Sequence, residues 1–231
     1  MKYLADHFTK KPWGFEYLIG NGGMTALWCL TIKRDISTSF HCHPLKRTGY
    51  VVLEGAVRVE FLSDQRILYS GDFINIRPGL FHRTTSMTDL AIVLEVESPD
   101  HKQDLLRLED SSGRESSVIE LPSRSIDVPP HLPFSKEFHD IFNLDTEVLL
   151  NGFSISKISY PSLEQVRLEG SGKDFMMILD GILFTNHTYP LVEAQRLLGA
   201  GDVISFKNFM KLKHLFSELT SPLTAIRFRV P

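Results

Sequence analysis

Two short stretches of this sequence recur in the same order about 130 residues further along the chain, and this repeat constrains the fold more than any other feature. YVVLEG at residues 50–55 is matched by MMILDG at residues 176–181. RILYSGDFI at residues 66–74 is matched by RLLGAGDVI at residues 196–204, with Arg, Leu, Gly, Asp and Ile at the same places. Two ordered matches at nearly the same spacing indicate a duplicated structural unit.

Each copy has the pattern of β-strands rather than of helices. Stretches such as TALWCLTIKR, GYVVLEGAVRVEFL and LAIVLEVES are short, rich in β-branched and aromatic residues, and separated by Gly, Asp, Asn, Pro and Ser. This pattern predicts an antiparallel sandwich or barrel. A buried helix at LAIVLEV is the strongest alternative, but its short length and β-branched content argue against it. We therefore expect an all-β chain with two tandem barrels.

A proline-rich stretch, IDVPPHLPF, separates the two copies. Proline cannot donate to a β-ladder, so this stretch is not a central strand. We place the boundary near residues 116–130, which gives an N-terminal domain over residues 1–120 and a C-terminal domain over residues 121–231. The following segment, SKEFHDIFNL, is expected to be a short helix capped by Ser135.

Composition excludes several classes of function. Of the 231 residues, 42% are hydrophobic, which is enough for a buried core, and the net charge of −3 argues against a nucleic-acid partner. No apolar run reaches the roughly 20 residues that span a bilayer, and the first residues lack the apolar core of a signal peptide. The only cysteines are Cys29 and Cys42, as is usual in a reducing compartment. We expect a cytoplasmic protein without a membrane partner.

Three histidines form the strongest chemical signal. His41 and His43 flank Cys42 on a predicted strand, where side chains two apart share a face and Cys42 points the other way. His82 follows the turn at residues 77–79 and is the third candidate. Three neutral imidazoles with an open position suit a borderline divalent metal. The sequence therefore predicts a metal site.

This arrangement resembles the cupin family, whose double-stranded β-helix (jelly-roll) barrels carry HxH, a Glu, a Gly and then a G…PxG…H pattern. The residues at those places are His41, His43, Gly55, Gly71, Pro78, Gly79 and His82. The usual Glu ligand is replaced by Thr48, and a neutral hydroxyl is a poor ligand beside a carboxylate. Three alternatives stay open: a three-histidine site, a metal completed by water, or a site that has lost its metal.

The first half also resembles the type II mannose-6-phosphate isomerase domain of bifunctional sugar-nucleotide enzymes. The motifs that carry this resemblance are KPWG at residues 11–14, the P…HR turn at residues 78–83, and EV…DLLRLEDSSGR at residues 95–114, with Ser112 where Tyr is usual. In the second copy, Arg167 and Glu169 fall where the paired histidines would be, and His214 lies near the third place but out of register. The second barrel is therefore expected to be degenerate and without metal.

The resemblance implies chemistry on a sugar phosphate or nucleotide sugar, with zinc as the expected metal and manganese, iron or nickel as alternatives. An aldose–ketose isomerase needs a base and an electrophile. Glu95 and Glu97 share a strand face and are the candidate bases, whether that face lines the pocket or meets solvent. Arg83, Arg77 and Lys46 are the candidates for binding phosphate, and Arg83 has the strongest claim because it follows the third histidine.

Two further predictions concern neighbouring residues. Arg107 and Arg114 are expected to form a structural clasp with the acidic residues around them. The apolar face of the strand at residues 90–98 is expected to pack into its own sandwich.

Three functions remain open at this stage. The first is a metal-dependent sugar-phosphate isomerase of cell-surface polysaccharide metabolism. The second is a three-histidine iron oxygenase, and the third is a non-catalytic sugar-binding or regulatory bicupin. Bound metal separates the two enzymes from the binding protein. A homodimer is compatible with all three.

Overall fold

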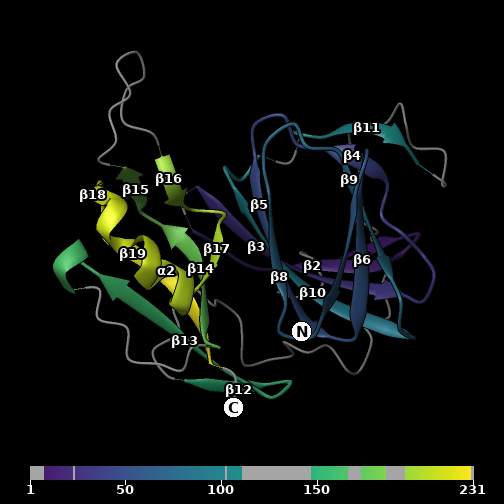
Figure 1. The fold of residues 1–231 in the computed structure, drawn as a ribbon. Helices are drawn as coiled ribbons and strands as arrows, with labels where there is room; N and C mark the ends of the chain where they lie inside the picture. Colours follow the sequence, from purple (N-terminus) through teal and green to yellow (C-terminus); the bar gives the residue numbers. More distant parts are fainter. Residues whose placement is uncertain are drawn as a thin grey trace.

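The structure is a computed structural model, and most of its described residues form two pairs of antiparallel β-sheets (Figure 1). The described residues are 8–22, 24–101, 103–110, 147–165, 173–185 and 196–229. Both the predicted domain boundary and the predicted helix capped by Ser135 lie outside them. Within them, no helix is long and apolar enough to cross a membrane.

The N-terminal half forms a six-stranded and a five-stranded sheet. The first has the order β1 (Phe8–Lys11), β2 (Gly14–Gly22), β3 (Thr25–Lys33), β10 (Leu90–Ser98), β5 (Arg47–Glu54) and β8 (Phe73–Ile76). The second has the order β11 (Leu106–Glu109), β4 (Phe40–Cys42), β9 (His82–Ser86), β6 (Ala56–Phe61) and β7 (Gln65–Tyr69). The two sheets enclose a barrel whose apolar core includes Trp28, Tyr50, Val57 and Val93.

The described part of the C-terminal half repeats this plan with fewer and shorter strands. One sheet has the order β12 (Val148–Leu150), β13 (Phe153–Tyr160), β19 (Leu223–Arg229), β14 (Phe175–Asp180) and β17 (Val203–Ser205). The other has the order β16 (Arg196–Gly199), β15 (Ile182–Thr185) and β18 (Phe216–Leu219). Short helical segments complete the half: η2 (Leu163–Gln165), α2 (Phe206–Leu212) and η3 (Lys213–Leu215).

The duplicated sequence stretches occupy equivalent places in the two halves. Strand β5 lies between β10 and β8, and its counterpart β14 lies between β19 and β17. Gly55 and Gly181 end these strands with φ values of 77° and 95°, in the left-handed region that favours glycine. A Cβ at Gly55 would lie 2.6 Å from the Leu90 carbonyl oxygen, so the backbone itself requires glycine. The all-β fold with two tandem barrels is confirmed.

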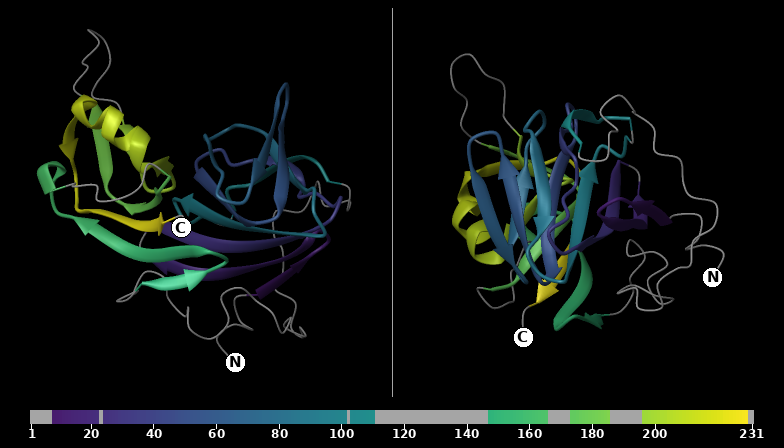
Figure 2. Two further views of the ribbon diagram at one scale, coloured as in Figure 1. Left: turned by 60° about the horizontal axis from the view of Figure 1, so that its bottom comes forward. Right: turned by 90° about the vertical axis from the view of Figure 1, so that its right-hand side faces the viewer.

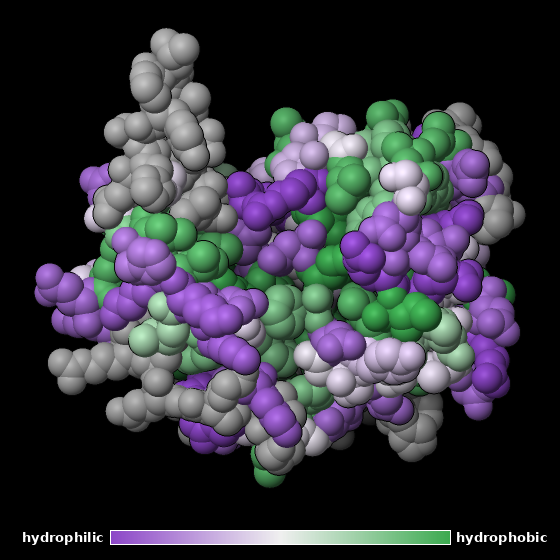
Figure 3. All heavy atoms as spheres, in the orientation of Figure 1, coloured by the Kyte–Doolittle hydropathy of each residue, from purple (hydrophilic) through white to green (hydrophobic). Residues whose placement is uncertain are grey.

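The two barrels share an apolar core where their larger sheets meet (Figure 2). Val51 and Leu94 of the first half belong to the same buried cluster as Met177 and Ile226 of the second. The six-stranded sheet is therefore buried on both faces, which explains its nearly continuous apolar strands. On the outside, polar side chains (purple) are interspersed with apolar ones (green) over the face that Figure 3 shows.

The packing of β10 differs from the prediction. Ile92, Leu94 and Val96 pack against the second barrel, not into their own sandwich. Because side chains alternate along a strand, Glu95 and Glu97 then point into the interior of the first barrel. If only one face of this sheet were buried, the apolar residues of β10 would point into the first barrel, as predicted. Because the second barrel covers the other face, they point toward it instead.

Polar contacts also join the two halves. Asp202 accepts hydrogen bonds from Arg47 at 2.9 Å and from Arg77 at 3.4 Å. The Asn75 side chain donates to the Val203 carbonyl at 2.8 Å and accepts from the Val203 N–H at 2.7 Å. These contacts fix the edge of the first barrel that is formed by β5 and β8.

Candidate metal centre

Neighbouring strands bring the three predicted histidines together inside the first barrel. His41 of β4 is the direct ladder partner of His82, the first residue of β9, and His43 follows β4. The ring centroids are 4.5 Å apart for His41 and His82, 5.0 Å for His41 and His43, and 5.9 Å for His43 and His82. All three side chains are buried. Their ligand nitrogens lie within 4.8 Å of one another, close enough to share one metal ion.

Each imidazole is held by a backbone carbonyl through Nδ1. His41 donates to Ser39 at 2.8 Å, His43 to Asp104 at 2.5 Å and His82 to Leu80 at 3.0 Å. A carbonyl oxygen only accepts, so Nδ1 carries the hydrogen and Nε2 keeps its lone pair. Metal-binding histidines are typically oriented in this way. The donor set therefore fits a divalent metal.

Burial also keeps the imidazoles in the form that binds metals. Burial lowers the pKa of both His43 and His82 to about 4, and the nearby positive charge of Lys46 contributes for His43. Burial, followed by repulsion from the other two rings, lowers the pKa of His41 well below its usual value. All three rings are thus neutral at pH 7, as ligation requires.

Two buried glutamates from β10 lie beside this cluster. The Oε1 of Glu97 is 3.8 Å from Nε2 of His43 and accepts a hydrogen bond from Nζ of Lys46 at 3.0 Å. Ligand atoms of His43, Glu95 and Glu97 all lie within 4.8 Å of one another. The predicted metal ligands and the predicted bases thus form two adjoining groups that share His43, and Lys46 contacts Glu97 of the second group.

The two glutamates have different electrostatic surroundings. Burial raises the pKa of Glu95 well above its usual value, and the charges of Glu97 and Glu16 add to this effect. The Tyr50 hydroxyl hydrogen bonds to Nε2 of His82 at 3.5 Å, and burial together with the charges of both glutamates raises the pKa of Tyr50 well above its usual value. Glu97 instead forms an ion pair with Lys46. Paired carboxylates in contrasting surroundings are a common arrangement for acid–base chemistry.

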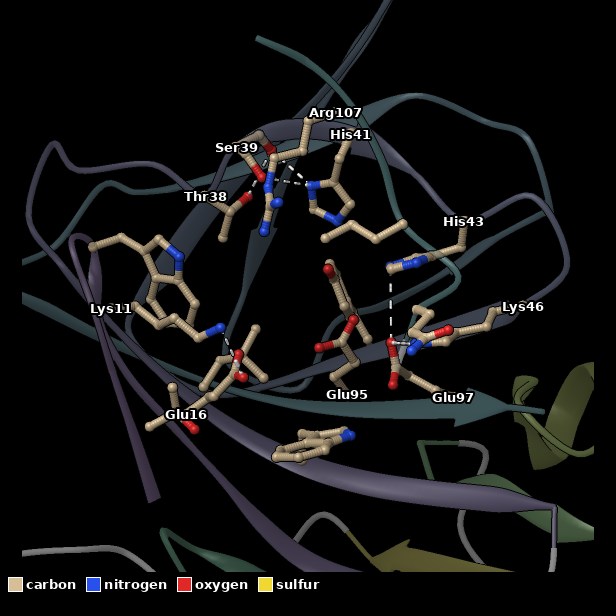
Figure 4. Close-up of a pocket in the computed structure, with 17 residues that line it drawn as sticks. Lys11, Glu16, Thr38, Ser39, His41, His43, Lys46, Glu95, Glu97 and Arg107 are labelled. Carbon is tan, nitrogen blue, oxygen red and sulfur yellow. Dashed lines mark hydrogen bonds and ion pairs between the residues drawn. The ribbon is translucent and has the colours of Figure 1, made fainter. Parts of the chain in front are cut away.

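The cluster faces a cavity of about 300 Å³ (Figure 4). Lys11 and Glu16 form an ion pair at 3.0 Å on the side of the cavity opposite His43 and Glu97. The remaining lining residues are mostly aromatic or hydroxyl-bearing and include Thr9, Trp13, Trp28, Thr38, Ser39 and Tyr50. The cavity therefore combines charged groups of both signs with aromatic walls.

Of the three cations predicted to bind phosphate, only Lys46 lines this cavity. Arg83 pairs with Glu60 at 3.1 Å and Glu109 at 3.6 Å, and it borders a separate hollow. Side chains alternate along β9, so the inward position of His82 directs Arg83 outward. Arg77 is engaged with Asp202 at the contact between the barrels.

Arg107, which was predicted to form a structural clasp with nearby acidic residues, lines the cavity. Strand β11 pairs with β4 so that Arg107 lies opposite His41, while its neighbours Leu106 and Leu108 are exposed. An alternating Leu-Arg-Leu pattern would normally predict that the leucines point inward and the Arg points outward, the reverse of what is found here. Nothing local in the sequence indicates which strand β11 pairs with. Arg114 lies outside the described residues.

The second barrel shows no comparable centre in its described part. No group of three metal-ligating side chains lies close together there. His214 is exposed, and Arg167 and Glu169 lie outside the described residues.

No protein-family model matches this sequence, and no curated protein is detectably similar to it. Solved structures with a similar fold include KdgF from Halomonas sp., with 19% identity over 41% of this chain and 88% of that chain and a TM-score of 0.39. A cupin-like protein from Thermotoga maritima has 18% identity over 48% of this chain and 85% of that chain, with a TM-score of 0.39.

A sugar phosphate isomerase of the cupin superfamily from Silicibacter pomeroyi has 18% identity over 36% of this chain and 58% of that chain, with a TM-score of 0.35. These likenesses concern the arrangement of strands over less than half of this chain. The finer resemblance to mannose-6-phosphate isomerase stays a prediction.

Proposed function

We propose that this protein is a metal-dependent enzyme that moves a proton between adjacent carbon atoms of a small sugar phosphate, as in aldose–ketose isomerisation. The observation that carries the proposal is the pair Glu95 and Glu97. Two buried carboxylates in contrasting surroundings share one cavity with three neutral imidazoles. Burying acidic groups is costly, and perturbed carboxylates in a cavity are typical of sites that transfer protons.

His41, His43 and His82 would hold the metal, with zinc expected and manganese, iron or nickel as alternatives. When bound, the ion would supply a positive charge that stabilises negative charge on a substrate oxygen and eases release of the Glu95 proton. The fit rests on the three Nε2 lone pairs and the backbone carbonyls that orient them.

Glu95 is the group that transfers the proton. Its raised pKa makes it a stronger proton acceptor than an ordinary carboxylate, and it lies opposite Tyr50 in the ladder between β10 and β5. Glu97 is held by Lys46 and contributes a fixed negative charge next to His43. The two residues predicted as candidate bases thus have separate roles.

The substrate class follows from the walls of the cavity. Lys11 and Arg107 line it together with Lys46, so a phosphate group finds cations there without Arg83 or Arg77. Trp13 and Trp28 offer ring faces to the apolar side of a sugar. A volume of about 300 Å³ is at the small end for ligand sites, which favours a monosaccharide phosphate over a nucleotide sugar.

The test measures exchange of substrate hydrogen with solvent rather than product formation. Exchange can be detected without knowing which sugar phosphate is the product. Zinc-loaded protein is incubated in D₂O with a panel of pentose and hexose phosphates, and proton NMR follows the signal of the hydrogen next to the carbonyl. We expect loss of that signal with at least one substrate, and no loss with the Glu95→Gln variant at unchanged zinc content.

Glu60→Gln is the matched control, because Glu60 pairs with Arg83 outside the cavity. This variant should exchange like the wild type. Exchange that survives in Glu95→Gln would remove Glu95 from the mechanism. Zinc-loaded protein that binds sugar phosphates without exchange would instead favour the non-catalytic bicupin.

A further inference from the structure

We propose that Glu97 supplies the carboxylate ligand that Thr48 lacks, so that three histidines and a glutamate from a different strand hold the metal. This inference rests on the metal site of the proposed function. It names a ligand that the motif spacing does not predict, because the spacing points to position 48 on β5 and Glu97 lies on β10.

The register of the sheet carries the first part of the argument. Glu97 lies directly opposite Thr48 in the ladder between β10 and β5. Directly opposite residues have Cβ atoms about 4.5–5.5 Å apart and project from the same face of a sheet. That face points inward, because Lys46 and Tyr50 on either side of Thr48 both line the cavity. A carboxylate at Glu97 of β10 therefore lies on the same wall of the cavity as a carboxylate at position 48 of β5 would.

The contacts of Glu97 carry the second part. Its Oε1 is 3.8 Å from Nε2 of His43, whose other nitrogen donates to the Asp104 carbonyl. Two atoms that offer only lone pairs therefore face each other in a buried place, which favours a cation between them. Lys46 approaches Oε1 at 3.0 Å and supplies positive charge to Glu97, while Nε2 of His43 remains without a proton. The glutamates and the other two histidines form separate groups on either side of His43, so a metal held by the three imidazoles would satisfy both atoms when the Glu97 carboxylate turns toward it.

Glu95 is the other candidate, and its contacts distinguish it from Glu97. Its ladder partner is Tyr50, whose hydroxyl hydrogen bonds to Nε2 of His82. Glu97 is the glutamate that contacts His43 directly and pairs with a cation. Deprotonated carboxylates are the form that ligates metals. The geometry therefore assigns Glu97 to the metal and leaves Glu95 for the proton.

The experiment measures metal binding in the absence of any substrate. Zinc affinity is determined by competition with a chromophoric chelator for the wild type and for Glu97→Gln, Glu97→Asp and Glu95→Gln. Cobalt(II) spectra of the same proteins report a change in the ligand set, and circular dichroism reports folding. Glu97→Asp retains the charge that faces Lys46, so this variant decides the question if Glu97→Gln does not fold.

Loss of an outer partner of a metal ligand alone costs roughly 10–100-fold in affinity. We therefore expect Glu97→Gln to weaken zinc binding by about 100-fold or more and to alter the cobalt spectrum. Glu97→Asp should weaken zinc by at least about 10-fold, and Glu95→Gln by less than about 3-fold. A Thr48→Glu change added to Glu97→Gln should restore part of the lost affinity, because it returns a carboxylate to the same wall.

Unchanged zinc affinity in Glu97→Asp or Glu97→Gln would overturn the proposal, as would equal losses for the Glu97 and Glu95 variants. The proposed function fails in a different way. Zinc binding that depends on Glu97 without any solvent exchange leaves the ligand assignment intact and removes the enzyme. Solvent exchange in a protein whose zinc affinity does not depend on Glu97 supports the proposed enzyme and removes Glu97 as a ligand. A wild-type protein that takes up no zinc removes both.

Discussion

Arg47 of the first barrel and Asp202 of the second meet at 2.9 Å across the contact between the two halves, and the Asp202 carboxylate is almost completely buried. The same carboxylate accepts hydrogen bonds from Arg77 and from the Gly199 N–H. Removing one partner of a buried ion pair leaves an uncompensated charge and typically costs about 3–5 kcal/mol. Arg47 keeps some access to water, so the lower end applies here.

We therefore expect Asp202→Ala to lower the free energy of unfolding by about 3 kcal/mol, as measured by denaturant titration. Asp64→Ala is the matched control, because Asp64 pairs with Arg66 in an exposed position. Exposed pairs contribute at most about 1 kcal/mol, so this control should change little. Equal effects of the two substitutions would mean that the contact between the barrels contributes no more than a surface pair.

Lys46 is expected to contribute more to the stability of the metal-free protein than to that of the zinc-loaded protein. Lys46→Met leaves Glu97 buried without its countercharge and should cost about 3 kcal/mol without metal. Zinc would then supply the missing positive charge, so the rise in melting temperature on adding zinc should exceed that of the wild type. Lys11→Met, at the other lysine of the cavity wall, should show the wild-type rise. The same rise in both variants would contradict the prediction.

Thr48 offers a substitution that should stabilise the protein. Its hydroxyl is buried and has no hydrogen-bond partner among the described residues. Leaving a buried polar group unsatisfied costs about 1–3 kcal/mol, so the nearly isosteric Thr48→Val change should raise the free energy of unfolding by about 1 kcal/mol. Zinc affinity should not change, because Thr48 is not a ligand. A large loss of zinc affinity in this variant would identify the hydroxyl as a ligand after all.

Stability of the metal-free protein should depend on pH through the histidines. The pKa values of His43 and His82 are about 4 in the folded protein, whereas a histidine in an unfolded chain titrates near 6.5. Between these values the unfolded chain binds more protons, so stability falls as the pH decreases from 6.5 to 4. A single ring contributes up to about 3 kcal/mol, at about 1.4 kcal/mol per pKa unit.

Denaturant titrations across this pH range test the prediction, with His43→Asn as the comparison. The variant lacks one of the shifted groups and should show a shallower decline. Identical slopes for the two proteins would mean that His43 does not titrate as its burial implies.

Local spacing was enough to predict the repeat, the two barrels and the meeting of the three histidines. HxH on a strand fixes the directions of two side chains, and the matching turn brings in the third. Alternation along the strand also predicted that Glu95 and Glu97 lie on the same face. It did not determine that this face lies inside the barrel, because the apolar face of β10 could be buried by its own sandwich or by a second sheet.

The cations that line the cavity were harder to predict because their positions depend on long-range register. Arg83 is next to a site histidine, and for that reason its side chain points away from the site. Arg107 reaches the cavity because β11 adds to the sheet beside β4, a pairing across more than 60 residues with no local signal. Thr48 occupies the position where the motif has its usual carboxylate. That Glu97 lies directly opposite follows only from the register of β5 and β10.

The shared core between the barrels has a consequence for how the protein behaves on dilution. Where two separate chains bury such a face against each other, their association weakens as protein concentration falls. Here the covering sheet is covalently linked to the sheet that it covers, so its effective concentration is independent of how much protein is present. The strand that carries Glu95 and Glu97 therefore stays packed against the second barrel even at very low protein concentration.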